Sequence, residues 1–176
     1  MSRFPLVVIV LGLVATGCGS DDSVNPSPVL PTRLVYTAAI SAANEVPPIT
    51  NAESGARGDA TLTFNLTRDG AGAITAGTVD VLATFSGFPA GTSLSLAHIH
   101  TGISTTTGGV VINLVPAPGE VTFPNGTGSY VRSGFPIGPP VDIVNQIIAN
   151  PSAFYFNVHS ALNPGGVARG QLVLRP

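Results

Sequence analysis

The chain carries little charge for its length and lacks one basic residue type altogether. Only 9% of its 176 residues are charged, and all 7 basic residues are arginine. Soluble proteins are typically about one quarter charged, and helical surfaces depend on lysine and glutamate, so this scarcity excludes a coiled coil, a helix bundle and a charge-rich disordered tail. A net charge of −2 also excludes the basic surface that nucleic-acid binding requires.

Cysteine and catalytic motifs are scarce as well. Cys18 is the single cysteine, so no intramolecular disulfide can form and no other cysteine is available as a nucleophile. No serine lies in the Gly-x-Ser-x-Gly motif of α/β-hydrolases. These absences favour a non-enzymatic role.

What the chain does contain is glycine, proline and short stretches of alternating apolar residues. Leu62, Phe64 and Leu66 alternate with threonine and asparagine, which is typical of a half-buried strand. Residues 69–72 carry a turn signal and alternation resumes in residues 78–85, so this pair predicts a β-hairpin. Further strands are predicted at residues 34–40, 94–100, 110–114, 129–132, 153–160 and 170–174. About eight short strands predict an all-β fold, an antiparallel sandwich or barrel.

One stretch breaks this two-residue period. Two prolines precede residues 141–150 and Pro151 follows them, an arrangement that brackets a short helix. Val141, Val144 and Ile148 would share one side of that helix. We therefore expect a single short helix that packs over an open end of the sandwich.

The amino-terminal residues are typical of a secretory signal peptide. Arg3 precedes a 12-residue apolar run at residues 4–15, which suits a signal peptide but is shorter than the roughly 20 residues that a membrane span needs. Small residues follow, and then Cys18. Residues 15–18 (Ala-Thr-Gly-Cys) resemble the lipobox of bacterial lipoproteins, although Ala15 stands where that motif most often has leucine.

The lipobox resemblance implies a cellular location and a domain organisation. Residues 1–17 would be a lipoprotein signal peptide, and Cys18 would be acylated on its thiol and its new amino terminus, which anchors the protein to the membrane. Gly19 implies the outer membrane in a Gram-negative cell. Residues 18–32, rich in glycine, serine, asparagine and proline, predict a flexible tether, and residues 33–176 one extracytoplasmic β domain. The alternative is an ordinary signal peptide followed by a free thiol.

Three segments of the predicted domain carry a second resemblance. They are residues 41–48 (Ser-Ala-Ala-Asn-Glu-Val-Pro-Pro), residues 97–102 (Ala-His-Ile-His-Thr-Gly) with 108–111, and residues 155–160 with 163–166 and 169–172. In this order they are similar to the CHRD domain, which is named for the extracellular signalling antagonist chordin and is common in bacterial secreted proteins. The resemblance spans residues 34–174 and implies an immunoglobulin-like β-sandwich or barrel.

The same segments contain residues that we expect to be structural: Asn44, Glu45, Asn157 and Arg169. The chain departs from the family at Gly109, where proline is common, and at residues 167–168, where Val-Ala replaces Glu-Ile. The second change removes a carboxylate beside Arg169. Glu45 is the carboxylate that could pair with Arg169 in its place.

The three histidines, His98, His100 and His159, are the candidate ligands for a metal ion. His98 and His100 are two apart on one predicted strand, about 6.5–7 Å from each other on one face, and His159 lies on another strand. Three imidazoles within reach of one point suit Cu or Zn. The pattern also resembles part of the copper site of copper–zinc superoxide dismutase, but that enzyme's bridging histidine and zinc ligands have no counterpart here, so dismutase activity is not implied.

Strand alternation argues against this convergence. His98 and His100 share the phase of Leu94, which indicates the core face, whereas His159 has the phase opposite to Phe156, which indicates the outer face. The three could meet only if a β-bulge shifted one phase. The alternative is that they are structural histidines hydrogen-bonded to neighbouring loops.

The sequence thus leaves three functions in competition. The first is a lipid-anchored, non-enzymatic module that binds a protein or polymer of the cell envelope. The second is a metal-binding or redox domain that holds Cu or Zn with the three histidines. The third is a purely structural role in the envelope.

Overall fold

The computed structural model describes residues 30–138 and 141–176. Cys18, the predicted leader, most of the predicted tether and the prolines at 139–140 lie outside the described residues. Within them the chain forms ten β-strands, one α-helix and two 3-10 helices. The predicted all-β fold is confirmed.

The elements follow one another in this order: β1 (Arg33–Ser41), η1 (Ala42–Asn44), β2 (Arg57–Arg68), β3 (Ile74–Ser86), β4 (Thr92–Thr101), β5 (Val110–Asn113), β6 (Thr122–Phe123), β7 (Gly128–Pro136), α1 (Asp142–Ala149), η2 (Pro151–Ala153), β8 (Phe154–Ser160), β9 (Ala168–Gln171) and β10 (Val173–Leu174). All eight predicted strands are present. The two-residue strand β6 was not predicted, and the predicted strand at residues 170–174 is two strands, because the chain leaves β9 before Leu172 and then pairs with β1 as β10.

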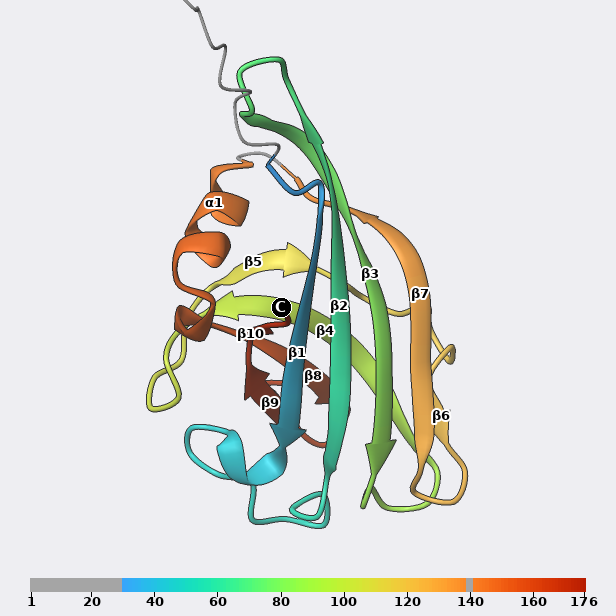
Figure 1. Ribbon diagram of the computed structural model, residues 1–176. Helices are drawn as coiled ribbons and strands as arrows, with labels where there is room; N and C mark the ends of the chain where they lie inside the picture. The colour runs from blue at the N-terminus through green and yellow to red at the C-terminus, as the bar shows by residue number, and fades with distance from the viewer. Residues whose placement is uncertain (1–29, 139–140) are drawn as a thin grey trace, which may run out of the picture.

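The strands form one antiparallel sheet in the order β5-β4-β8-β9-β1-β2-β3-β7. In Figure 1, β1, β2, β3 and β7 run nearly upright in one layer, and β4, β5, β8 and β9 cross behind them in a second layer. The sheet therefore curls into a nearly closed barrel whose core lies between the layers.

The alternation of β2 decides which side chains enter this core. Leu62, Phe64 and Leu66 are buried, as the period of two predicts. Phe64 packs edge-to-face on Tyr36 of the neighbouring β1, with 5.2 Å between ring centroids. At the crossing of β9 and β1, a side chain on Gly170 would come within 2.3 Å of the carbonyl oxygen of Ala39, so only glycine permits this close approach.

Helix α1 lies at the left of Figure 1, beside the space between the two layers. Its buried residues are Val144 and Ile147, which belong to the core, whereas Val141 and Ile148 are half-buried. The predicted helix is confirmed, and its predicted apolar side (Val141, Val144 and Ile148) packs against the core, with Ile147 added as a fully buried residue. None of the helices in the described residues combines the length and apolarity that crossing a bilayer demands.

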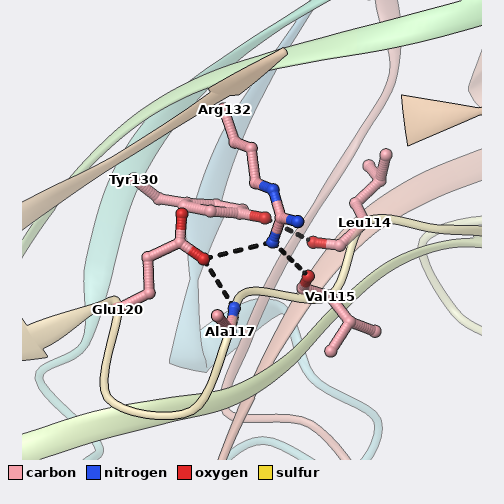
Figure 2. A network of polar contacts seen from close by, with 6 residues as sticks. All are labelled: Leu114, Val115, Ala117, Glu120, Tyr130 and Arg132. Carbon is pink, nitrogen blue, oxygen red and sulfur yellow. Dashed lines mark hydrogen bonds and ion pairs between the residues drawn. The ribbon is translucent and has the colours of Figure 1, made fainter. Parts of the chain in front are cut away.

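One end strand of the sheet, β7, is joined by side chains to the segment that follows the other end strand, β5. Figure 2 shows this seam: the hydroxyl of Tyr130 on β7 donates to the carbonyl of Leu114 at 2.8 Å, and Arg132 donates to the carbonyl of Val115 at 3.3 Å. Arg132 also forms an ion pair with Glu120 at 3.2 Å. These contacts close the barrel where strand pairing stops.

Candidate metal centre

A β-bulge in β4 decides where the first two histidines point. Leu94 pairs with Ser160 but Leu96 pairs with His159, so one extra residue is accommodated between them. Leu94 faces the core, and after the bulge Ala97 and Ile99 do so, both fully buried. The expectation that His98 and His100 share the core face with Leu94 is therefore wrong, because the bulge reverses their phase.

His98 and His100 consequently share the outer face of the sheet with His159. Paired residues on neighbouring strands point to the same side, and His98 pairs with Asn157 on β8 while His100 pairs with Tyr155. His159, two residues beyond Asn157, shares that face, as its phase predicts. The face is nevertheless buried: His98, His100 and His159 are 7%, 8% and 4% exposed.

Loops bury this outer face by folding over it. The guanidinium of Arg169 on β9 donates to the carbonyls of Asn44, Ser104 and Thr106 at 2.7, 2.8 and 2.9 Å. The side chain of Gln171 donates to the carbonyl of Gly102 at 2.9 Å. The loop after β1 and the loop between β4 and β5 are thereby tied down over the histidines.

The three histidines lie close enough to share an ion. One ligand nitrogen from each lies within 4.8 Å of the others. Nδ1 of His98 and Nε2 of His159 are 3.1 Å apart, and two metal–nitrogen bonds of about 2 Å could join them. The described residues hold one such cluster, and it is the set that the sequence proposed.

Two of the rings are oriented by backbone carbonyls. Nδ1 of His100 donates to the carbonyl of Gly108, and Nδ1 of His159 to that of Pro164, both at 3.0 Å. Hydrogen bonds to the neighbouring loops, the basis of the structural interpretation, are therefore present as well. Each of these rings uses Nδ1 for the loop, which leaves the Nε2 lone pair directed elsewhere.

Burial favours the neutral form of all three imidazoles. It lowers the pKa of His98 to about 4, with smaller contributions from His159 and His100. Burial also lowers the pKa of His100 and of His159, although the hydrogen bonds to Gly108 and Pro164 act in the opposite direction. Neutral imidazole is the form that binds a metal ion, so no proton has to be removed from a charged ring.

Glu45 does not form the expected pair with Arg169. Within the described part of the chain the one ion pair joins Arg132 and Glu120, and the carboxylate of Glu45 has no hydrogen bond to Oε1 although the residue is 7% exposed. Burial raises the pKa of Glu45 to about 7, and the charge of Arg169 lowers it by less. The structural roles expected of Asn44 and Arg169 agree with the loop contacts, because Asn44 also donates to the carbonyl of Arg169 at 3.0 Å.

Unpartnered atoms gather in this layer. Nε2 of His100, Oε1 of Glu45 and Oδ1 of Asn157 are buried without a hydrogen-bond partner among the described residues. A carboxylate oxygen and an amide oxygen accept hydrogen bonds, and Nε2 of His100 is also an acceptor because Nδ1 carries the proton. The layer therefore has a surplus of acceptors, which a cation or a donor would satisfy.

Sequence reasoning missed two residues of this layer. The ring of Tyr155 stacks on His100 at 5.0 Å with 6° between planes, and the guanidinium of Arg169 lies 4.4 Å from the centroid of Tyr155. Glu53, 2% exposed, accepts hydrogen bonds from Ser160 and Asn163 and holds the loop after β8. Tyr155 has the same strand phase as His159, so alternation along β8 could have placed it on this face. Glu53 lies in an irregular segment, where no alternation exists to place it.

Two hollows open on the surface beside this layer, and Glu45 lines both. One, of about 520 Å³, also has Ser104, Thr105 and Gln171 in its wall. The other, of about 350 Å³, is bounded by Pro47 and by residues 162–166. Neither hollow is lined by a histidine, so the three rings lie beneath the loops that form this surface.

Comparison with known families identifies the domain. No curated protein and no solved structure matches the chain. The family model described as the CHRD domain matches residues 36–172, which include most of the barrel and the layer of buried histidines. Because that match covers well over half of the chain, the chain belongs to the CHRD domain family.

Proposed function

We propose that this protein is a lipid-anchored, extracytoplasmic CHRD module of a bacterial cell that acts without catalysis, by binding a protein or polymer of the cell envelope or by a structural contact there. The lipobox that ends at Cys18 is the observation that carries the proposal. Family membership supports a non-enzymatic module. Gly19 after the cysteine extends the proposal to the outer membrane if the cell is Gram-negative.

The arrangement of the barrel supports an orientation in which the η1 loop points away from the membrane. The described chain begins at the top of Figure 1, and β1 leads from there to the η1 loop at the opposite end. Nine residues of strand, at about 3.3 Å each, separate the two ends by about 25–30 Å. A tether attached at residue 30 would therefore hold the η1 loop and its hollows away from the membrane surface.

Metabolic labelling tests the anchor. Cells that express the full chain are grown with a palmitate analogue, and the wild-type protein is compared with Cys18→Ser. We expect labelling of the wild type and none of the variant, with the wild type in the membrane fraction. Equal labelling of the two proteins would contradict lipid anchoring at Cys18.

A second candidate function is metal binding by the three histidines. The observation that favours it is the convergence of His98, His100 and His159 within 4.8 Å in their neutral form. Copper or zinc titration of the purified protein tests it. We expect saturable binding of one ion that is lost in His100→Ala. Failure of both metals to bind would leave the histidines with a structural role only.

A further inference from the structure

We infer that the ion selected by this centre is copper(I), bound by Nε2 of His100, Nε2 of His159 and Nδ1 of His98. The inference rests on the metal-binding candidate above and adds the ligand atoms, the oxidation state and the reason for the choice. Nδ1 of His98 now donates to Nε2 of His159 over 3.1 Å. An ion between them would take the place of that proton, and the proton would move to Nε2 of the same ring, so His98 stays neutral.

The hydrogen bonds of the layer assign these ligand atoms. Nε2 of His100 is buried and has no partner in the described structure, although its Nδ1 is held by the carbonyl of Gly108. The carbonyl of Pro164 holds Nδ1 of His159 in the same way. A backbone carbonyl on the second ring nitrogen is the usual outer partner of a metal-binding histidine, because it fixes the tautomer and the ring plane.

The number of ligands favours copper(I) over zinc. Protein zinc sites are tetrahedral and need a fourth ligand, which is either a side chain or water. No cysteine, aspartate or glutamate of the described residues, Glu45 included, lies close enough to the three rings to join the cluster, and neither nearby hollow is lined by a histidine. Copper(I) shares the filled d shell of Zn(II) but carries one charge less and is stable with two or three ligands, so a buried set of three neutral nitrogens satisfies it.

The charge of the surroundings favours a monovalent ion. His100 on β4 and Arg169 on β9 approach Tyr155 from the two strands that flank β8, with the ring between them. The guanidinium of Arg169 is 1% exposed and forms no ion pair in the described residues. At about 10 Å and an effective dielectric constant of about 20, each extra unit of positive charge on the ion weakens binding by about tenfold.

The experiment compares metal ions on the full chain carrying Cys18→Ser, since the thiol of Cys18 would itself bind copper(I). Copper(I) is supplied in competition with the chelator bicinchoninate, and Zn(II) and Cu(II) with chelators of known affinity. We expect one equivalent of copper(I), bound at least about tenfold more tightly than Zn(II).

His100→Asn is the matched variant, because the asparagine amide can still donate to the carbonyl of Gly108 but supplies no Nε2. It should weaken copper(I) binding by at least about 100-fold, more than loss of an outer partner costs.

A second measurement keeps the test valid if His100→Asn fails to fold. Ag(I), which has the same charge and also a filled d shell and is stable in air, is added to the ¹⁵N-labelled Cys18→Ser protein. The resonances of Nε2 of His100 and His159 and of Nδ1 of His98 should shift together at one equivalent. Zn(II) or Cu(II) bound as tightly as copper(I) would overturn the choice of ion while leaving a metal site. Binding of no metal would overturn that choice and the metal-binding candidate together.

Discussion

Glu45 has a buried carboxyl oxygen without a hydrogen-bond partner among the described residues. The stability of the folded protein should therefore depend on pH through this group. Burial raises its pKa to about 7, from the ordinary value of 4.5. Between these two values the folded protein binds more protons than the unfolded chain, so the contribution of Glu45 to stability falls as pH rises through the window and stays low above it.

Replacing Glu45 with glutamine should remove this penalty. We expect Glu45→Gln to unfold at higher urea concentration than the wild type at pH 8, by about 1–3 kcal/mol in the free energy of unfolding, and to differ little at pH 4.5. The comparison with wild type at each pH cancels the titration of the three histidines, which is common to both proteins. An equal difference at the two pH values would show that Glu45 is ionised in the folded protein throughout this range.

At the scale of elements, hydrogen bonds from Tyr130 and Arg132 on β7 hold the barrel together where strand pairing stops. The hydroxyl of Tyr130 donates to the buried carbonyl of Leu114, whereas the hydroxyl of Tyr36 on β1 is buried with no partner among the described residues. The same substitution should therefore have opposite effects at the two positions. A lost hydrogen bond leaves a buried carbonyl unsatisfied, but removal of an unpartnered hydroxyl removes a desolvation cost.

We expect Tyr130→Phe to lower the free energy of unfolding by about 1–2 kcal/mol and Tyr36→Phe to leave it unchanged or raise it. Urea denaturation followed by fluorescence or circular dichroism measures both. The two variants lose the same atom from rings that are 1% and 0% exposed, so Tyr36→Phe is the control for the change in side chain. Equal destabilisation of the two would indicate that the seam of Figure 2 does not depend on this hydrogen bond.

The strands also show what alternation can and cannot predict. β2 and β3 were predicted because a period of two is a local property of each strand. The orientation of His98 and His100 was not, because a single bulged residue after Leu94 reverses every later side chain of β4. Nothing in Leu94-Ser95-Leu96 marks that bulge, since it depends on how β4 pairs with β8.

At the scale of the whole molecule, the absence of lysine gives the lipid anchor a distinctive signature. The 176 residues contain no lysine, so none of their side chains carries a primary amine. If the leader is cleaved and the amine of Cys18 is acylated, the mature protein has no primary amine. We expect an amine-reactive biotin ester to leave the mature wild-type protein unlabelled on denatured membranes.

The uncleaved Cys18→Ser variant should be labelled once, at its amino terminus, and provides the positive control. Mass spectrometry of the wild type then gives the number of acyl chains. Labelling of a wild-type protein of mature size would mean that its new amino terminus is free. That result would limit the anchor to the thiol of Cys18 or exclude it.

The sequence by itself determined the class of the fold, its strands and its short helix, because these follow from local periodicity, turn residues and helix-bracketing prolines. It also identified the three histidines and the segments that mark a CHRD domain. Only the tertiary structure decided that the histidines meet on the outer face under loops held by Arg169, and that Glu45 stays unpaired. Those features depend on strand register, on one bulge and on contacts between residues far apart in the chain, such as Asn44 and Arg169.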